Sequence, residues 1–137
     1  MFRPDLTQIN HTGRELELLC AGTKPLAWFI FSMDYEQDLY VAHRAQFAPL
    51  VDSGRLVEAS YDETLTYDPK LERNLLVRTV LYALPEEAWR MPAMRMILEV
   101  SCTHRDIGHN EIINRLMGRL LGYTEQEIEA FVAATSE

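Results

Sequence analysis

Apolar residues recur with helical spacing most clearly in the last third of the chain. Between His109 and Leu121 they fall at i, i+1, i+4, i+5, i+8 and i+9, which is one continuous stripe on a helix. The stripe consists of Ile112, Ile113, Leu116, Met117, Leu120 and Leu121. Gly122 favours an end to this helix, and Thr124 with Glu127 forms a capping box that starts another. The pattern predicts a C-terminal helical hairpin with a buried stripe.

Three stretches have the composition of β-strands. Residues 26–32 are apolar on both faces and rich in aromatic side chains, which is typical of a strand covered on both sides. Residues 55–61 alternate imperfectly, and residues 75–83 are largely apolar. Residues 62–73 are polar and contain Pro69, which favours a long loop. We therefore expect a small sheet of about three strands packed with helices.

Helix signals flank and separate these strands. Residues 13–21 predict a short helix, and residues 35–47 predict a second one that Asp34 can cap. Pro49 is expected to kink or restart the second helix. A further helix follows the last strand, and Pro92 is expected to break it. Strands and helices in this arrangement predict the α+β class.

The composition fits one globular domain. Of the 137 residues, 47% are hydrophobic and 25% are charged, which is ordinary for a folded chain. Because no repeat or flexible linker divides the chain, we expect a single domain over residues 1–137. No stretch approaches the length of a membrane span, and the first residues lack the apolar run of a signal peptide. We expect a cytoplasmic protein without membrane contacts.

The net charge of −8 makes the chain acidic. Nucleic-acid binders usually carry a basic face, because neutralising phosphates supplies much of their affinity. The last two helices resemble a helix-turn-helix arrangement only in order, since residues 125–134 contain no basic side chain for a DNA groove. We therefore expect no nucleic-acid partner.

The densest set of reactive side chains lies in an expected inter-helix loop at residues 102–109. His104, Arg105, Asp106 and His109 form a candidate ligand-binding site. The site would serve a small enzyme through acid–base chemistry, or bind an anion through Arg105 and the following helix N-terminus. Alternatively, Asp106 simply caps that helix.

Metal and cofactor signals are weak along the chain. Cys102 with His104 and His109 offers zinc donors, but a second pair of ligands is missing, so we expect no metal. There is no phosphate-binding glycine loop and no catalytic motif, and we expect no cofactor. Cys20 is expected to be a buried thiol, like Cys102. Whether the protein is an enzyme stays open.

The function that these patterns favour is a non-catalytic interaction or regulatory module. Methionine and arginine are frequent in residues 90–100 and 109–121, which suits protein interfaces. Trp89 is either a surface anchor for a partner or packs against the sheet. The arginines of this region form either a basic face or helical ion pairs. Because apolar strands need cover on both faces, we expect self-association, as a homodimer, or binding to another protein.

Overall fold

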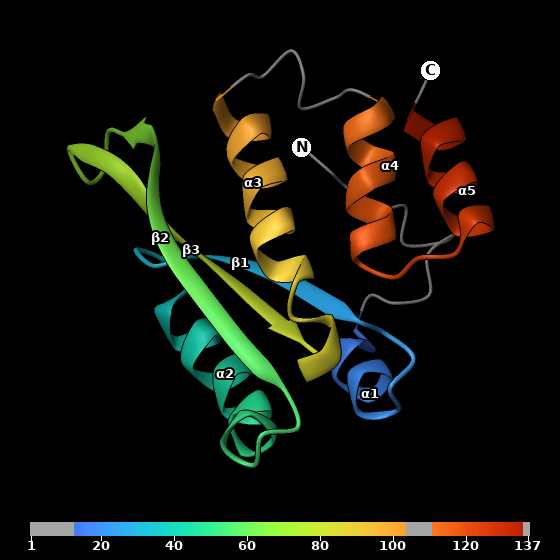
Figure 1. Ribbon diagram of the computed structural model, residues 1–137. Coiled ribbons are helices and arrows are strands. Elements are labelled where there is room, and N and C mark those ends of the chain that lie inside the picture. The colour runs from blue at the N-terminus through green and yellow to red at the C-terminus, as the bar shows by residue number, and fades with distance from the viewer. Residues whose placement is uncertain (1–12, 104–110, 136–137) are drawn as a thin grey trace.

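A three-stranded antiparallel sheet with helices on both faces forms the centre of the molecule (Figure 1). The computed structural model describes residues 13–103 and 111–135. The strands are β1 (Leu26–Ser32), β2 (Val57–Asp68) and β3 (Arg73–Ala83), and their order in the sheet is β1-β3-β2. The helices are α1 (Glu15–Cys20), α2 (Gln37–Asp52), α3 (Arg90–Thr103), α4 (Glu111–Leu120) and α5 (Glu125–Thr135), and a short 3-10 helix, η1 (Pro85–Glu87), precedes α3. The expected α+β class is confirmed.

The central strand β3 contributes to a hydrophobic cluster on each face of the sheet. Val80 and Tyr82 point toward α1 and α2, whereas Leu81 and Ala83 point toward α3, α4 and α5. This alternation follows from the two-residue period of a strand. Trp28 is partly buried and packs against the cluster that contains Leu81 and Ala83. Because the chain's own helices cover both faces of the sheet, the need to cover apolar strands is no argument for a homodimer.

The region expected to be a long loop is instead the outer part of a β-hairpin. Residues 62–68 continue β2 and pair with β3 as far as Asp68 opposite Arg73, with a register shift between Thr64 and Tyr67. The expectation was wrong because polar residues were taken as a loop signal. In a hairpin, cross-strand pairs satisfy polar side chains, as where Arg78 binds the Asp62 carboxylate through two hydrogen bonds of 2.7 and 2.8 Å.

The helix is continuous through each proline, so neither the expected break at Pro92 nor a restart at Pro49 is present. Pro49 lies in the last turn of α2, which continues to Asp52, so the missing amide removes little of the helix's hydrogen bonding. Pro92 is the third residue of α3, where backbone amides have no partner within the helix. A proline near either end of a helix can therefore be accommodated without a break.

Asp34 and Cys20 also differ from expectation. Asp34 does not cap α2, because its carboxylate accepts a 2.9 Å hydrogen bond from the Leu76 amide and pairs with Arg73. These two contacts, the Leu76 amide first, hold the pKa of Asp34 below its usual range. Cys20 ends α1 with an exposed thiol, whereas its neighbour Leu19 is buried in the core.

The turn between α4 and α5 is held by the two residues that precede β1. Gly122 adopts a left-handed backbone with φ of 85°, and a Cβ there would lie 2.3 Å from Pro25 Cδ. The buried Lys24 donates a 2.6 Å hydrogen bond to the Leu121 carbonyl, and its ammonium lies 4.8 Å from the centre of the Tyr123 ring. Burial lowers the pKa of Lys24 to about 8, against smaller opposing effects of nearby carboxylates.

The expected capping box at the start of α5 is confirmed. The Thr124 amide donates to the Glu127 carboxylate at 2.8 Å, and the Glu127 amide donates to the Thr124 hydroxyl at 3.1 Å. These reciprocal hydrogen bonds satisfy two backbone donors that the helix itself leaves without partners. The C-terminal helical hairpin therefore forms as predicted.

Candidate interaction surface

The inner side of α4 is set by a close contact with α5. Gly118 is buried, and a Cβ there would lie 2.9 Å from Ile128 Cγ1. Because glycine has no side chain, α5 can approach α4 closely at this level. The contact turns Asn114, Met117 and Gly118 toward the interior, and Leu121 just beyond the helix is buried with them.

The outer side of α4 carries two members of the predicted stripe that are not buried. Ile112 is 66% exposed and Leu116 is 40% exposed. The expectation that the whole stripe packs inside was therefore wrong. Its six positions span about 180° of the helix circumference, which is wider than the face a helix usually buries. That width was the signal in the sequence that part of the stripe would face outward.

The neighbouring helix α3 adds exposed apolar side chains to the same region. Arg90 Nη1 donates to the carbonyl oxygens of Arg119 at 2.9 Å and Leu120 at 3.2 Å, so the start of α3 lies beside the end of α4. Met96 is 66% exposed, and Trp89, just before the helix, is 57% exposed. Trp89 directly precedes the first turn of α3, and Met96 lies in the second turn.

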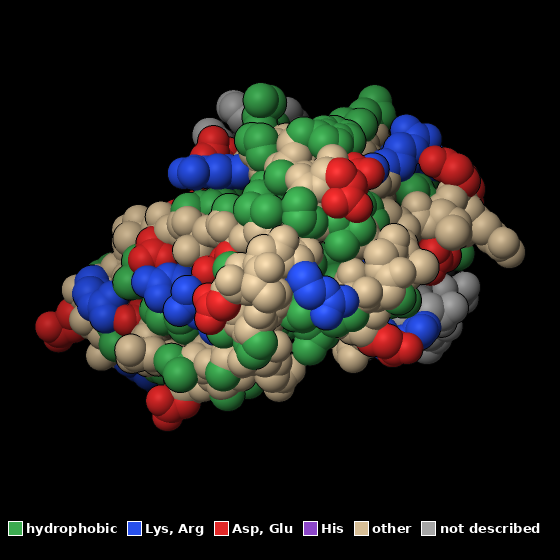
Figure 2. All heavy atoms as spheres, turned by 60° about the horizontal axis from the view of Figure 1, so that its bottom comes forward, with side chains coloured by type: hydrophobic (Ala, Val, Ile, Leu, Met, Phe, Trp, Pro, Cys, Tyr) green, Lys and Arg blue, Asp and Glu red, His purple; other side chains and the backbone are tan. Residues whose placement is uncertain are grey.

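We call the surface formed by Trp89, Met96, Ile112 and Leu116 the α3–α4 face. Trp89 is held in place, since its indole N–H donates to the Glu87 carboxylate at 3.0 Å and the Arg90 guanidinium lies 4.7 Å from the centre of its ring. Figure 2 shows hydrophobic side chains gathered between groups of opposite charge in the upper part of the view. Of the two alternatives for Trp89, the exposed position agrees with the surface anchor.

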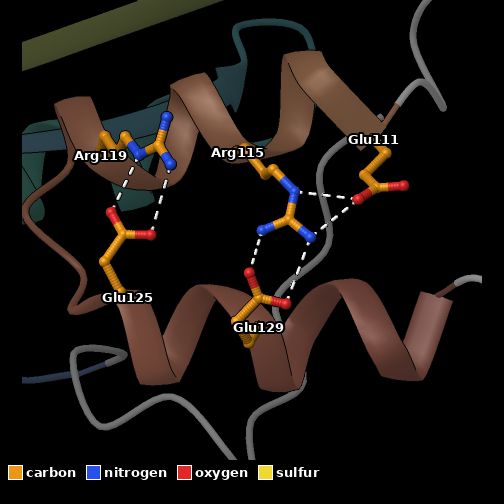
Figure 3. A network of polar contacts seen from close by, with 5 residues as sticks. All are labelled: Glu111, Arg115, Arg119, Glu125 and Glu129. Atoms are coloured by element: carbon orange, nitrogen blue, oxygen red, sulfur yellow. Dashed lines mark hydrogen bonds and ion pairs between the residues drawn. The ribbon is translucent and has the colours of Figure 1, made fainter.

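Ion pairs between α4 and α5 border this face on one side (Figure 3). Arg115 binds Glu111 at 2.7 and 2.9 Å and also pairs with Glu129 on α5. Arg119 binds the Glu125 carboxylate at 2.9 and 3.3 Å. The carboxylates raise the pKa of both guanidinium groups, which stay charged. These pairs fasten α5 to α4.

On its other side, the face is bordered by Arg95 and Glu99 of α3. These residues form an ion pair of 3.2 Å, and the Arg95 guanidinium lies 4.3 Å from the centre of the Tyr61 ring on β2. Within the described ranges, the arginines of this region are thus matched by carboxylates of the same chain. These arginines therefore form helical ion pairs and do not form a basic face.

The candidate loop site lies outside the described residues. His104, Arg105, Asp106 and His109 all belong to this part of the chain. The anion-site hypothesis and the capping alternative therefore both remain predictions. Within residues 13–103 and 111–135, no group of three or more histidine, cysteine, aspartate or glutamate side chains could hold a metal ion.

His43 is the histidine of the described residues, and it lies partly buried between α2 and the sheet. Its ring centre lies 4.2 Å from that of Phe29, 4.9 Å from that of Phe47 and 5.3 Å from that of Phe31. Partial burial lowers the pKa of His43, against a smaller opposing effect of Glu15. Its surroundings are those of a neutral imidazole that packs as an aromatic ring.

Comparisons with protein families, with curated proteins and with solved structures find no match for this chain. Among the described helices, none is both long and apolar enough to cross a membrane. The α3–α4 face, one of the places where the described chain exposes large apolar side chains, is the basis of the function proposed below.

Proposed function

We propose that this protein is a non-catalytic interaction or regulatory module that binds a protein partner through the α3–α4 face. The observation that carries this proposal is the exposure of four large apolar side chains, three on the neighbouring helices α3 and α4 and one directly before α3. These side chains are Trp89, Met96, Ile112 and Leu116. Single exposed apolar residues are common on soluble proteins, but a contiguous group of them marks interaction sites.

The composition and the setting of the face both support binding to a protein. Tryptophan and methionine are enriched at interfaces, and a buried tryptophan often supplies much of the binding free energy. The paired charges of Arg95 and Arg115 border the apolar centre, as a polar rim borders the core of an interface. The hydrogen bonds from Arg90 to the carbonyl oxygens of Arg119 and Leu120 hold the start of α3 beside the end of α4, so the face is formed before a partner arrives, which lowers the entropic cost of binding.

The proposal can be tested with single charged substitutions. Met96→Glu and Leu116→Glu each place a carboxylate on the face, whereas Leu39→Glu places one on α2, on the opposite side of the sheet. All three residues are exposed, so the folds should survive, which far-UV circular dichroism checks. We expect the immobilised wild-type chain to retain partner proteins from a cell lysate to which tagged copies of the chain have been added. The first two variants should lose these proteins. The Leu39→Glu variant should retain them, and equal retention by all three variants would contradict the proposal.

A further inference from the structure

The α3–α4 face is a nearly neutral region of an acidic chain. Among the described residues, its borders carry four arginines and five glutamates that form ion pairs, while the whole chain carries a net charge of −8. When two copies of one surface meet, each presents the same charges to the other, so a net acidic surface opposes self-association. The balanced border removes this repulsion where the apolar side chains are exposed. A basic partner, by contrast, would find the glutamates already paired.

The geometry of the face also suits a second copy. From the end where Arg90 contacts Leu120, Met96 lies about 9 Å along α3 and Leu116 lies about 6 Å along α4, at a rise of 1.5 Å per residue. A twofold axis that lies in the plane of the contact, parallel to the two helices and between them, places α3 of each copy over α4 of the other. Such an axis keeps heights along the helices unchanged, so it places Met96 of each copy against Leu116 of the other.

From these observations, and resting on the proposed function, we infer that the partner on the α3–α4 face is a second copy of this chain. The two copies form a twofold-symmetric dimer in which α3 and α4 of each pack against α4 and α3 of the other. Interfaces of this kind bury the same patch on both subunits, so one exposed apolar surface per chain is sufficient. The result is a four-helix layer between two sheets, with apolar side chains at its centre.

Sedimentation velocity of the purified full chain tests this inference. Over about 1–100 µM, the range in which moderate interfaces dissociate, we expect a monomer–dimer equilibrium for the wild-type chain. Met96→Glu and Leu116→Glu should each weaken the dimer by about tenfold or more, because a carboxylate is then buried among apolar groups. Leu39→Glu, which adds the same charge, should leave the dissociation constant unchanged. Dimers that resist both face substitutions would overturn the inference.

Mixing two variants tests the pairing of residues across the twofold axis. Met96→Glu and Leu116→Lys each weaken self-association, but in a mixed dimer the new carboxylate faces the new ammonium, and the other contact is the native one. We therefore expect the mixture to dimerise more tightly than either variant alone. A mixture that stays as monomeric as its components would overturn the proposed pairing.

Salt dependence and the lysate experiment separate this inference from the proposed function. Because two chains of charge −8 repel each other, added salt should strengthen the dimer, and a dimer that salt dissociates would contradict an apolar contact. A wild-type chain that is monomeric over the whole range overturns the dimer. If Met96→Glu then still abolishes binding of another protein from the lysate, the proposed function stands without self-association. If neither face variant changes any binding, both are wrong.

Discussion

The inner and outer sides of α4 carry similar apolar side chains in opposite environments. Met117 is almost fully buried between the sheet and α5, whereas Leu116, the preceding residue, is 40% exposed. The difference arises because Gly118 lets α5 approach on the inner side, while nothing in the described chain covers the outer side to the same extent. The comparison teaches that an apolar stripe can contain two surfaces, one that stabilises the fold and one that is available for binding.

The largest effect on stability is expected at Gly122, which follows the buried side of α4. Gly122→Ala should lower the free energy of unfolding by about 4 kcal/mol, because left-handed strain and a clash with Pro25 add together. Urea denaturation measures this change. Gly54→Ala is the matched control, since Gly54 also has a positive φ but nothing within 4 Å of a Cβ, and it should cost only about 1 kcal/mol. Equal losses would show that the contact with Pro25 is unimportant.

The comparison of Met117 with Leu116 should give the next largest effect. Met117→Ala should lower the free energy of unfolding by about 3 kcal/mol, as expected for a truncated core side chain. Leu116→Ala should lower the free energy of unfolding of the monomer by less than about 1 kcal/mol, because much of the Leu116 side chain is already in water. Urea melts at a low protein concentration, where a dimer would dissociate, measure both values. A large loss for Leu116→Ala would mean that the outer side belongs to the core of the monomer.

The buried Lys24 should make stability depend on alkaline pH. Its pKa is lowered from 10.5 to about 8 in the folded chain, so between these values the unfolded chain binds more protons than the folded one. Stability should therefore rise by about 1–2 kcal/mol as the pH goes from 8 to 10. Above pH 10 the effect reverses, because burial raises the pKa of Tyr123 and favours its neutral form in the folded chain. Urea melts at several pH values should show this rise, and Lys24→Met should abolish it.

The smallest effect is expected from the ion pairs that border the face. Arg115→Gln removes contacts to Glu111 and Glu129, so the melting temperature should fall slightly in low salt and hardly at all in high salt. Arg119→Gln, which removes a single partner, should have a still smaller effect. Thermal melts at two salt concentrations measure the difference. An effect of Arg115→Gln that is as large in high salt would indicate lost packing of its alkyl chain in place of lost charge.

Two signals in the sequence, apolar strands and a capping box, made the sheet and the C-terminal hairpin predictable. The strands at residues 26–32 and 75–83 are apolar enough that burial in a sheet is their stable environment. The capping box of Thr124 and Glu127 is local chemistry, so its hydrogen bonds form in any context that permits the helix. Where a signal depends on neighbouring residues alone, the sequence is sufficient.

The parts that were not predicted depend on distant residues. Residues 62–68 form a strand because β3 lies beside them, and no local pattern announces that partner. A polar segment of this kind can form a loop or a strand. The two conformations differ in free energy mainly through pairing with a neighbouring strand, which is a tertiary contact. The candidate loop at His104 and His109 could be chosen for its chemistry, but its role stays a prediction.

By itself, the sequence determined an acidic α+β chain with an apolar sheet and a capped C-terminal hairpin, because composition, strand alternation and capping act over short distances. Only the tertiary structure decided which side of α4 faces the core. A helical stripe about 180° wide has no unique inner side until a neighbour approaches it. That neighbour is α5, and it approaches where Gly118 leaves room for Ile128. Ile112 and Leu116 remain exposed for this reason, and they form half of the surface on which the proposed function depends.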